Sequence, residues 1–119
     1  MTGERTLDPA ALERLLEITG GEIEFLDELV DTYLDDAVVQ LDGLRQAIAE
    51  GDLAGLVRPA HSLKSNSDNV GALALAALSR TLEMDARAGT VPDPADQVAA
   101  IEREFNAVRA ALLEARASR

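Results

Sequence analysis

Residues 22–51 read EIEFLDELVDTYLDDAVVQLDGLRQAIAEG, and this stretch decides the fold. Its apolar positions recur at alternating steps of four and three, at Val30, Leu34, Ala37, Leu41, Leu44 and Ile48. Residues at this spacing share one face of an α-helix, and Gly51 is a typical helix stop. We therefore predict a helix over about Glu22 to Glu50 that buries one side only and is roughly 40 Å long.

The segment before this helix predicts a short helix of its own. Asp8 followed by Pro9 is the signal of an N-cap and a first-turn proline. The apolar face carries Leu12, Leu15 and Leu16. The paired glycines Gly20 and Gly21 are expected to end this helix.

The segment after Gly51 predicts a third helix, capped by Asp52 and continuing toward Asn69. Its apolar face carries Leu53, Leu56, Val57, Ala60, Leu63 and Ser67. Pro59 lies inside this pattern, and an interior proline removes one backbone hydrogen bond and clashes with the preceding turn. We therefore expect an interruption, with a bend around Gly55 to Arg58.

Two more helices complete the chain. After Gly71, a fourth helix places Leu75, Leu78 and Leu82 on one face and stops near Gly89. Asp93 and Pro94 repeat the start signal, and the fifth helix carries a heptad seam of Val98, Ile101, Phe105, Val108 and Leu112. No segment alternates with period two over a strand's length. The pattern predicts an all-α fold, an antiparallel up-down four-helix bundle in a single domain over residues 1–119, with the short first helix covering one end.

Composition and charge exclude several classes of function. The chain of 119 residues has 22 acidic and 11 basic residues, a net charge of −11, which is the wrong sign for nucleic acid or anionic membranes. It has no cysteine, so disulfide bonds and thiol chemistry are excluded. No apolar run approaches the length of a membrane span. We expect a cytoplasmic protein that binds neither nucleic acid nor membrane.

The sequence contains a single histidine, His61, inside the third helix. Helical rotation places it roughly 120° from the centre of the apolar face, so the ring should face water. Lys64 and Ser65 are its neighbours on the helix surface, and Asp68 follows one turn later. A small polar patch therefore surrounds one imidazole.

The sequence around this histidine resembles the signature of the histidine-containing phosphotransfer (HPt) domain of two-component phosphorelays. Residues 60–72 read AHSLKSNSDNVGA. The matching residues are Ala60, His61, Leu63, Lys64, Ser67, Gly71, Ala72 and Leu75. The resemblance extends over most of the chain, since residues 25–29, the Gly51-Asp52 junction and Leu82-Glu83 also fall where that family places them.

The resemblance implies that His61 accepts a phosphoryl group from a receiver aspartate or a histidine kinase and passes it to another receiver. A neutral imidazole nitrogen is a competent nucleophile toward phosphorus. The protein would be a monomeric carrier, not a turnover enzyme, without a cofactor of its own, and the magnesium ion would belong to the receiver.

The resemblance also implies roles for residues near His61. Lys64 would offset the charge of phosphohistidine, and Gly71 would permit an unusual backbone angle, a close helix approach or a helix end. Asn66 and Ser67 would at most support the site. Ser65 departs from the family pattern, which has glycine there, and borders the docking path.

Three alternatives to phosphotransfer are considered from the sequence. With Ser65 and Pro59 as its support, a degenerate HPt-like bundle would serve only for protein docking or inhibition. The acidic face of the second helix could suggest a metal site; it carries Glu22, Glu24, Asp27, Glu28, Asp31, Asp35, Asp36, Asp42 and Glu50. One histidine and the absence of a calcium-loop pattern favour a solvated face opposed only by Arg45. A serine triad is disfavoured because no nucleophile elbow is present.

Overall fold

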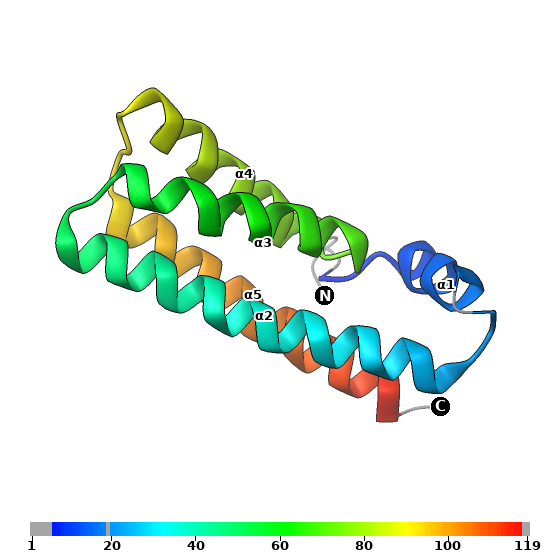
Figure 1. The fold of residues 1–119 in the computed structure, drawn as a ribbon. Coiled ribbons are helices and arrows are strands. Elements are labelled where there is room, and N and C mark those ends of the chain that lie inside the picture. The colour runs from blue at the N-terminus through cyan, green and yellow to red at the C-terminus, as the bar shows by residue number, and fades with distance from the viewer. Residues whose placement is uncertain (1–5, 19, 118–119) are drawn as a thin grey trace.

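The computed structural model describes residues 6–18 and 20–117, and within these ranges the chain is helical without a strand (Figure 1). In chain order the elements are α1 (Pro9–Ile18), α2 (Ile23–Glu50), the 3-10 turn η1 (Ala54–Leu56), α3 (Val57–Asn69), α4 (Leu73–Ala88) and α5 (Pro94–Ala117). The predicted all-α class is confirmed. In the described ranges, no helix combines the length and the apolar character that crossing a membrane would take.

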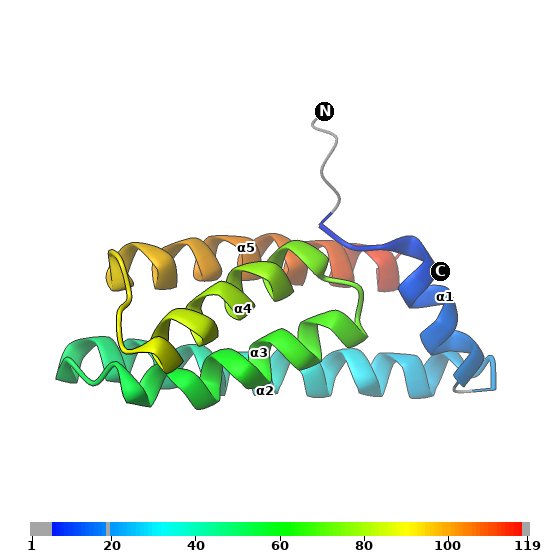
Figure 2. The same ribbon diagram turned by 90° about the horizontal axis from the view of Figure 1, so that it is seen from above.

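The four longer helices form an antiparallel up-down bundle (Figure 1, Figure 2). Neighbours around the bundle follow chain order, so α2 packs against α3 and α5, and α4 packs against α3 and α5. The short α1 lies across the end where α2 begins and α5 finishes (Figure 2). This is the arrangement that the sequence predicts, and it exposes the outer face of every helix of the bundle.

The seams predicted for the two longest helices face the core. On α5 the five buried positions are Val98, Ile101, Phe105, Val108 and Leu112. On α2 the fully buried members of the stripe are Val30, Ala37, Leu41 and Leu44, with Leu34 and Ile48 partly buried beside them. Gly51 ends α2 with a φ of 66°, in the left-handed region where a glycine carries no Cβ penalty.

The start of α3 differs from the prediction, and Pro59 does not interrupt it. Asp52 does not cap the α-helix as predicted; its Oδ1 accepts the Gly55 N–H at 3.0 Å, within the 3-10 turn that precedes α3. α3 begins only at Val57. Pro59 is therefore its third residue, in the first turn, where a backbone N–H has no acceptor within the helix. The expected irregularity at residues 55–58 is the change from 3-10 to α-helix.

The predicted apolar face of α4 is wrong at one position. Leu75 and Leu82 are fully buried, but Leu78 is 37% exposed. Its expected place toward the core is taken by Ser79 and Glu83, which are both buried. The two polar residues lie on the inward side of α4, and this placement brings Glu83 to the candidate site.

The first helix follows its prediction. Asp8 caps α1, since its Oδ1 accepts the Ala10 N–H at 3.1 Å. The helix ends at Ile18, before the paired glycines. Leu15 packs against the core from the edge, whereas the side chain of Leu12, which we assigned to the same face, lies outside the described part of the chain.

Candidate functional site

His61 lies in the second turn of α3 with 51% of its side chain exposed. The neighbouring core positions Ala60 and Leu63 are 0% and 1% exposed. The imidazole therefore projects from the outer face of a helix whose inner face is fixed by packing. The exposure predicted from the helical period is confirmed.

A single buried carboxylate organises the groups around His61. Glu83 of α4 has only 7% of its side chain exposed, and its Oε2 lies 3.0 Å from His61 Nδ1. The same Oε2 accepts a hydrogen bond from Arg87 Nε at 3.0 Å, and Arg87 Nη2 forms an ion pair with it at 2.8 Å. Lys64 Nζ lies 3.4 Å from the other oxygen, Oε1. The packing of α3 on α4 thus brings His61 and Lys64 to a carboxylate that Arg87 contacts from within α4.

These partners keep Glu83 ionised. Burial by itself raises the pKa of Glu83, but hydrogen bonds from Arg87 and His61 and the charge of Lys64 outweigh burial and lower that pKa below its usual value. An ionised carboxylate can only accept a hydrogen bond. In the contact between His61 and Glu83 the proton is therefore on His61 Nδ1. In the neutral ring the lone pair is then on Nε2, which has no hydrogen-bond partner among the described residues.

Lys64 and Ser65 both lie about one turn after His61 on α3. Around the helix axis they lie on opposite sides of the His61 side chain. Lys64 is three residues on, 28% exposed, and its ammonium group is turned toward Glu83. This differs from a freely solvated lysine and places a positive charge next to the imidazole. Ser65 is four residues on and partly exposed, on the flank of His61 away from α4.

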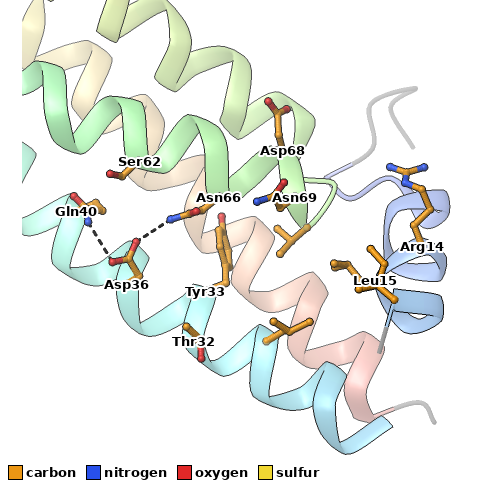
Figure 3. Close-up of a pocket in the computed structure, with 13 residues that line it drawn as sticks. Arg14, Leu15, Thr32, Tyr33, Asp36, Gln40, Ser62, Asn66, Asp68 and Asn69 are labelled. Carbon is orange, nitrogen blue, oxygen red and sulfur yellow. Dashed lines mark hydrogen bonds between the residues drawn. The ribbon is translucent and has the colours of Figure 1, made fainter. Parts of the chain in front are cut away.

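Asn66 and Ser67 face α2 and are not brought together with the imidazole. Ser67 is fully buried, and its Oγ lies 2.9 Å from the Tyr33 hydroxyl. Burial raises the pKa of Tyr33 to about 12, although the Ser67 hydrogen bond lowers it. Asn66 Nδ2 donates to Asp36 Oδ2 at 3.0 Å, in an open groove of about 710 Å³ between α1, α2 and α3 (Figure 3). Both residues join helices within the bundle.

Gly71 lies at the corner between α3 and α4, beyond the end of α3. Its φ of 81° is in the left-handed region, and a Cβ there would lie 2.6 Å from the Ala11 Cβ. The Gly71 carbonyl also accepts the Asp8 N–H at 2.8 Å. The unusual angle and the close helix approach therefore occur together, and they fasten α1 to the bundle at a distance from the imidazole.

Sequence reasoning missed the two α4 residues that contact His61 or its partner. The sequence analysis identified Glu83 only as part of the Leu82-Glu83 match to the HPt family. It assigned no role to Arg87. The available signals were their i, i+4 spacing, typical of an ion pair, and an acidic residue close to the apolar side of α4, which requires a partner. In the described part of the chain, no group of three or more His, Cys, Asp or Glu side chains is placed to hold a metal ion.

Comparisons with known proteins agree with this geometry. The profile of the Hpt domain matches residues 28–111. The crystal structure of histidine-containing phosphotransfer protein B (HptB) from Pseudomonas aeruginosa is similar, with 32% sequence identity and a TM-score of 0.88, over 98% of this chain and 99% of that one. A comparison with curated proteins found no match. From its sequence and its fold alike, the chain belongs to the Hpt domain family.

Proposed function

We propose that this protein is a phosphorelay intermediate whose phosphoacceptor is His61. It takes a phosphoryl group from the aspartyl phosphate of a receiver domain or from a histidine kinase, and it passes that group to another receiver. We further propose that it acts as a monomer in the cytoplasm and as a carrier, not as a turnover enzyme. The observation that carries the proposal is the half-exposed imidazole held through Nδ1 by a buried, ionised carboxylate.

The anchored ring supports a direct chemical step. The Nε2 lone pair attacks phosphorus, a bond forms between Nε2 and phosphorus, and the bond between phosphorus and the aspartyl oxygen breaks to release the receiver carboxylate. The Nδ1 proton stays in place, so the phosphorylated ring is a cation that donates to Glu83. In the reverse step a receiver carboxylate attacks phosphorus, and the electron pair of the broken bond returns to Nε2.

The division of labour follows from what this chain supplies. Phosphoryl transfer depends on positioning and on neutralising charge. Glu83 orients the nucleophile, and the ammonium group of Lys64 lies beside it. We assign the magnesium ion to the acidic pocket of the receiver.

The alternative of a pure docking module loses one of its two supports. Pro59 lies in the first turn of α3, where proline is tolerated, so it does not distort the helix that carries His61. The remaining departure from the family pattern is Ser65.

One labelling experiment tests the proposal. The protein is mixed with a phosphorylated receiver or kinase, and the product is examined for an acid-labile, base-stable label. Because the sequence has one histidine, any phosphohistidine on the intact protein must be His61. His61→Gln should abolish the label without changing helicity, since the exposed ring contributes little packing. A label that persisted in this variant would exclude His61 as the acceptor, and unlabelled wild-type protein that still bound receivers would favour the docking module.

A further inference from the structure

The positive charges of this acidic chain are not evenly placed. α3 and α4 together hold four basic and three acidic residues, whereas α2 holds one basic and eight acidic residues. A phosphoryl group on His61 carries close to two negative charges, which the cationic ring offsets only in part, in a chain whose net charge is already −11. The cations of α3 and α4 therefore decide how well that added charge is tolerated.

Arg87 is the arginine whose position relative to His61 is fixed by a shared partner. Its guanidinium and His61 Nδ1 bond to the same atom, Glu83 Oε2, at 2.8 to 3.0 Å. The guanidinium is thus an immediate neighbour of the imidazole. The Arg87 side chain is 59% exposed, so it can change rotamer without opening the core.

We propose that Arg87 is a phosphoryl-binding residue, which Glu83 holds beside the ring until His61 is phosphorylated. This inference rests on the proposed function, because it requires a phosphoryl group on Nε2. The guanidinium fork matches two phosphoryl oxygens, and a nearly dianionic group competes well with a single carboxylate. Arg87 then leaves Glu83 for the phosphoryl group.

The charges around Glu83 balance in this exchange. On phosphorylation the ring becomes cationic while its Nδ1–H still points at Glu83, so the hydrogen bond between them becomes charge-assisted. Glu83 gains this interaction as it loses Arg87, and Lys64 remains near its other oxygen. The buried carboxylate is thus never left without a positive partner.

Side-chain NMR on the full-length protein tests the exchange directly. The ¹⁵N-labelled chain is phosphorylated with phosphoramidate, whose phosphorus–nitrogen bond breaks to release ammonia as the bond to His61 Nε2 forms. The Nε–H resonance of Arg87 should shift on phosphorylation, whereas that of the exposed Arg103 on α5 should not. An Arg87 resonance that moves no more than that of Arg103 overturns the proposal.

Matched variants test the energetic consequence. We compare the ratio of phosphorylated to unphosphorylated protein at a fixed ratio of phosphoramidate to ammonium, read by intact-protein mass spectrometry. Arg87→Gln should lower this ratio roughly two- to fivefold, as expected for one partly exposed charge contact, and Arg87→Lys should lower it less. Arg103→Gln removes the same charge elsewhere and should leave the ratio unchanged.

The outcomes separate this inference from the function on which it rests. Equal ratios in Arg87→Gln and Arg103→Gln, with a labelled wild-type protein, contradict only the role of Arg87. A wild-type protein that phosphoramidate and phosphorylated receivers both fail to label contradicts the proposed function itself.

Discussion

His61 Nδ1 lies 3.0 Å from Glu83 Oε2, although 22 positions separate the two residues in the chain. The bond crosses the interface between α3 and α4, and its acceptor is buried while its donor is half exposed. The orientation of the ring is therefore set by the neighbouring helix as well as by its own. This relationship makes Glu83 a positioning residue for the nucleophile.

Removing the Glu83 side chain should slow phosphotransfer more than removing its charge. Glu83→Ala leaves the ring without an anchor, and misplacement of a nucleophile costs roughly tenfold or more in rate. Glu83→Gln keeps an oxygen that can accept from Nδ1–H, so it should lose less. The measurement is the rate of labelling by a phosphorylated receiver, with Glu114→Gln on the exposed face of α5 as control. Equal rates in Glu83→Ala and the control would contradict the positioning role.

The same carboxylate should make stability depend on pH. The native pKa of Glu83 is lowered from its ordinary value of 4.5, so its contribution to folding is fully present above that value. It is lost as the pH falls through the native pKa, because the unfolded chain takes up the proton at higher pH. We compare the free energy of unfolding of the wild-type protein with that of Glu83→Gln. The difference between the two should be constant above about pH 6 and should shrink below pH 4.5. Urea titrations at several pH values measure this difference, and a difference unchanged down to about pH 3 would contradict the assignment.

Lys64→Ala should slow transfer to and from a receiver while leaving the bundle intact. The ammonium group lies next to the nucleophile, on the carboxylate that anchors it, and it offsets charge that the phosphoryl group adds. We expect a reduction of about two- to fivefold at low salt, smaller at high salt because exposed charges are screened. Arg103→Ala, which removes an exposed cation on α5, is the matched control. Unchanged rates at low salt would reduce Lys64 to a surface residue.

Periodicity predicts well where each helix carries its own signal. The α5 seam from Val98 to Leu112 is apolar at every core position, so its burial follows from sequence alone. The exposure of His61 follows from the same reasoning applied to α3. Both results depend only on the rotation per residue within one helix.

The predictions that were wrong share one cause. They concern features that depend on contacts between secondary-structure elements. Glu83 and Ser79 are polar residues at inward positions of α4, so the apolar pattern favoured Leu78 instead. The contact of Glu83 with His61 depends on how α3 packs against α4, which no single-helix pattern contains. Pro59 was misjudged because the 3-10 turn moves the start of the α-helix to Val57.

Ser79→Ala should stabilise the fold. The Ser79 side chain is fully buried, and its Oγ has no hydrogen-bond partner within the described part of the chain. Removing an unsatisfied buried hydroxyl and gaining helix propensity should raise the free energy of unfolding by about 1 kcal/mol.

Ser67 provides a matched control for this change. Ser67 is equally buried but bonded to the Tyr33 hydroxyl, so Ser67→Ala should destabilise the fold by about 1 kcal/mol because it orphans that group. Urea unfolding of both variants checks the pair of signs. A Ser79→Ala variant as unstable as Ser67→Ala would show that the Ser79 hydroxyl is satisfied in solution.

Ser65 tests where a receiver approaches. It lies one turn after His61 on the outer face of α3 and is partly exposed, so it borders the path that a receiver must take to Nε2. A serine side chain is small enough to leave that path open. Ser65→Gly should therefore transfer phosphoryl groups as fast as the parent or faster, while costing roughly 0.5 kcal/mol of stability because glycine is the poorer helix former.

Ser65→Gln should retain the fold yet block transfer from a phosphorylated receiver by filling the space beside the imidazole. The small donor phosphoramidate should still label this variant, which separates a blocked docking path from a damaged nucleophile. If Ser65→Gln exchanged phosphoryl groups with the receiver as quickly as the parent, position 65 would not border the docking surface, and the receiver would have to approach His61 from the α4 side, past Glu83 and Arg87.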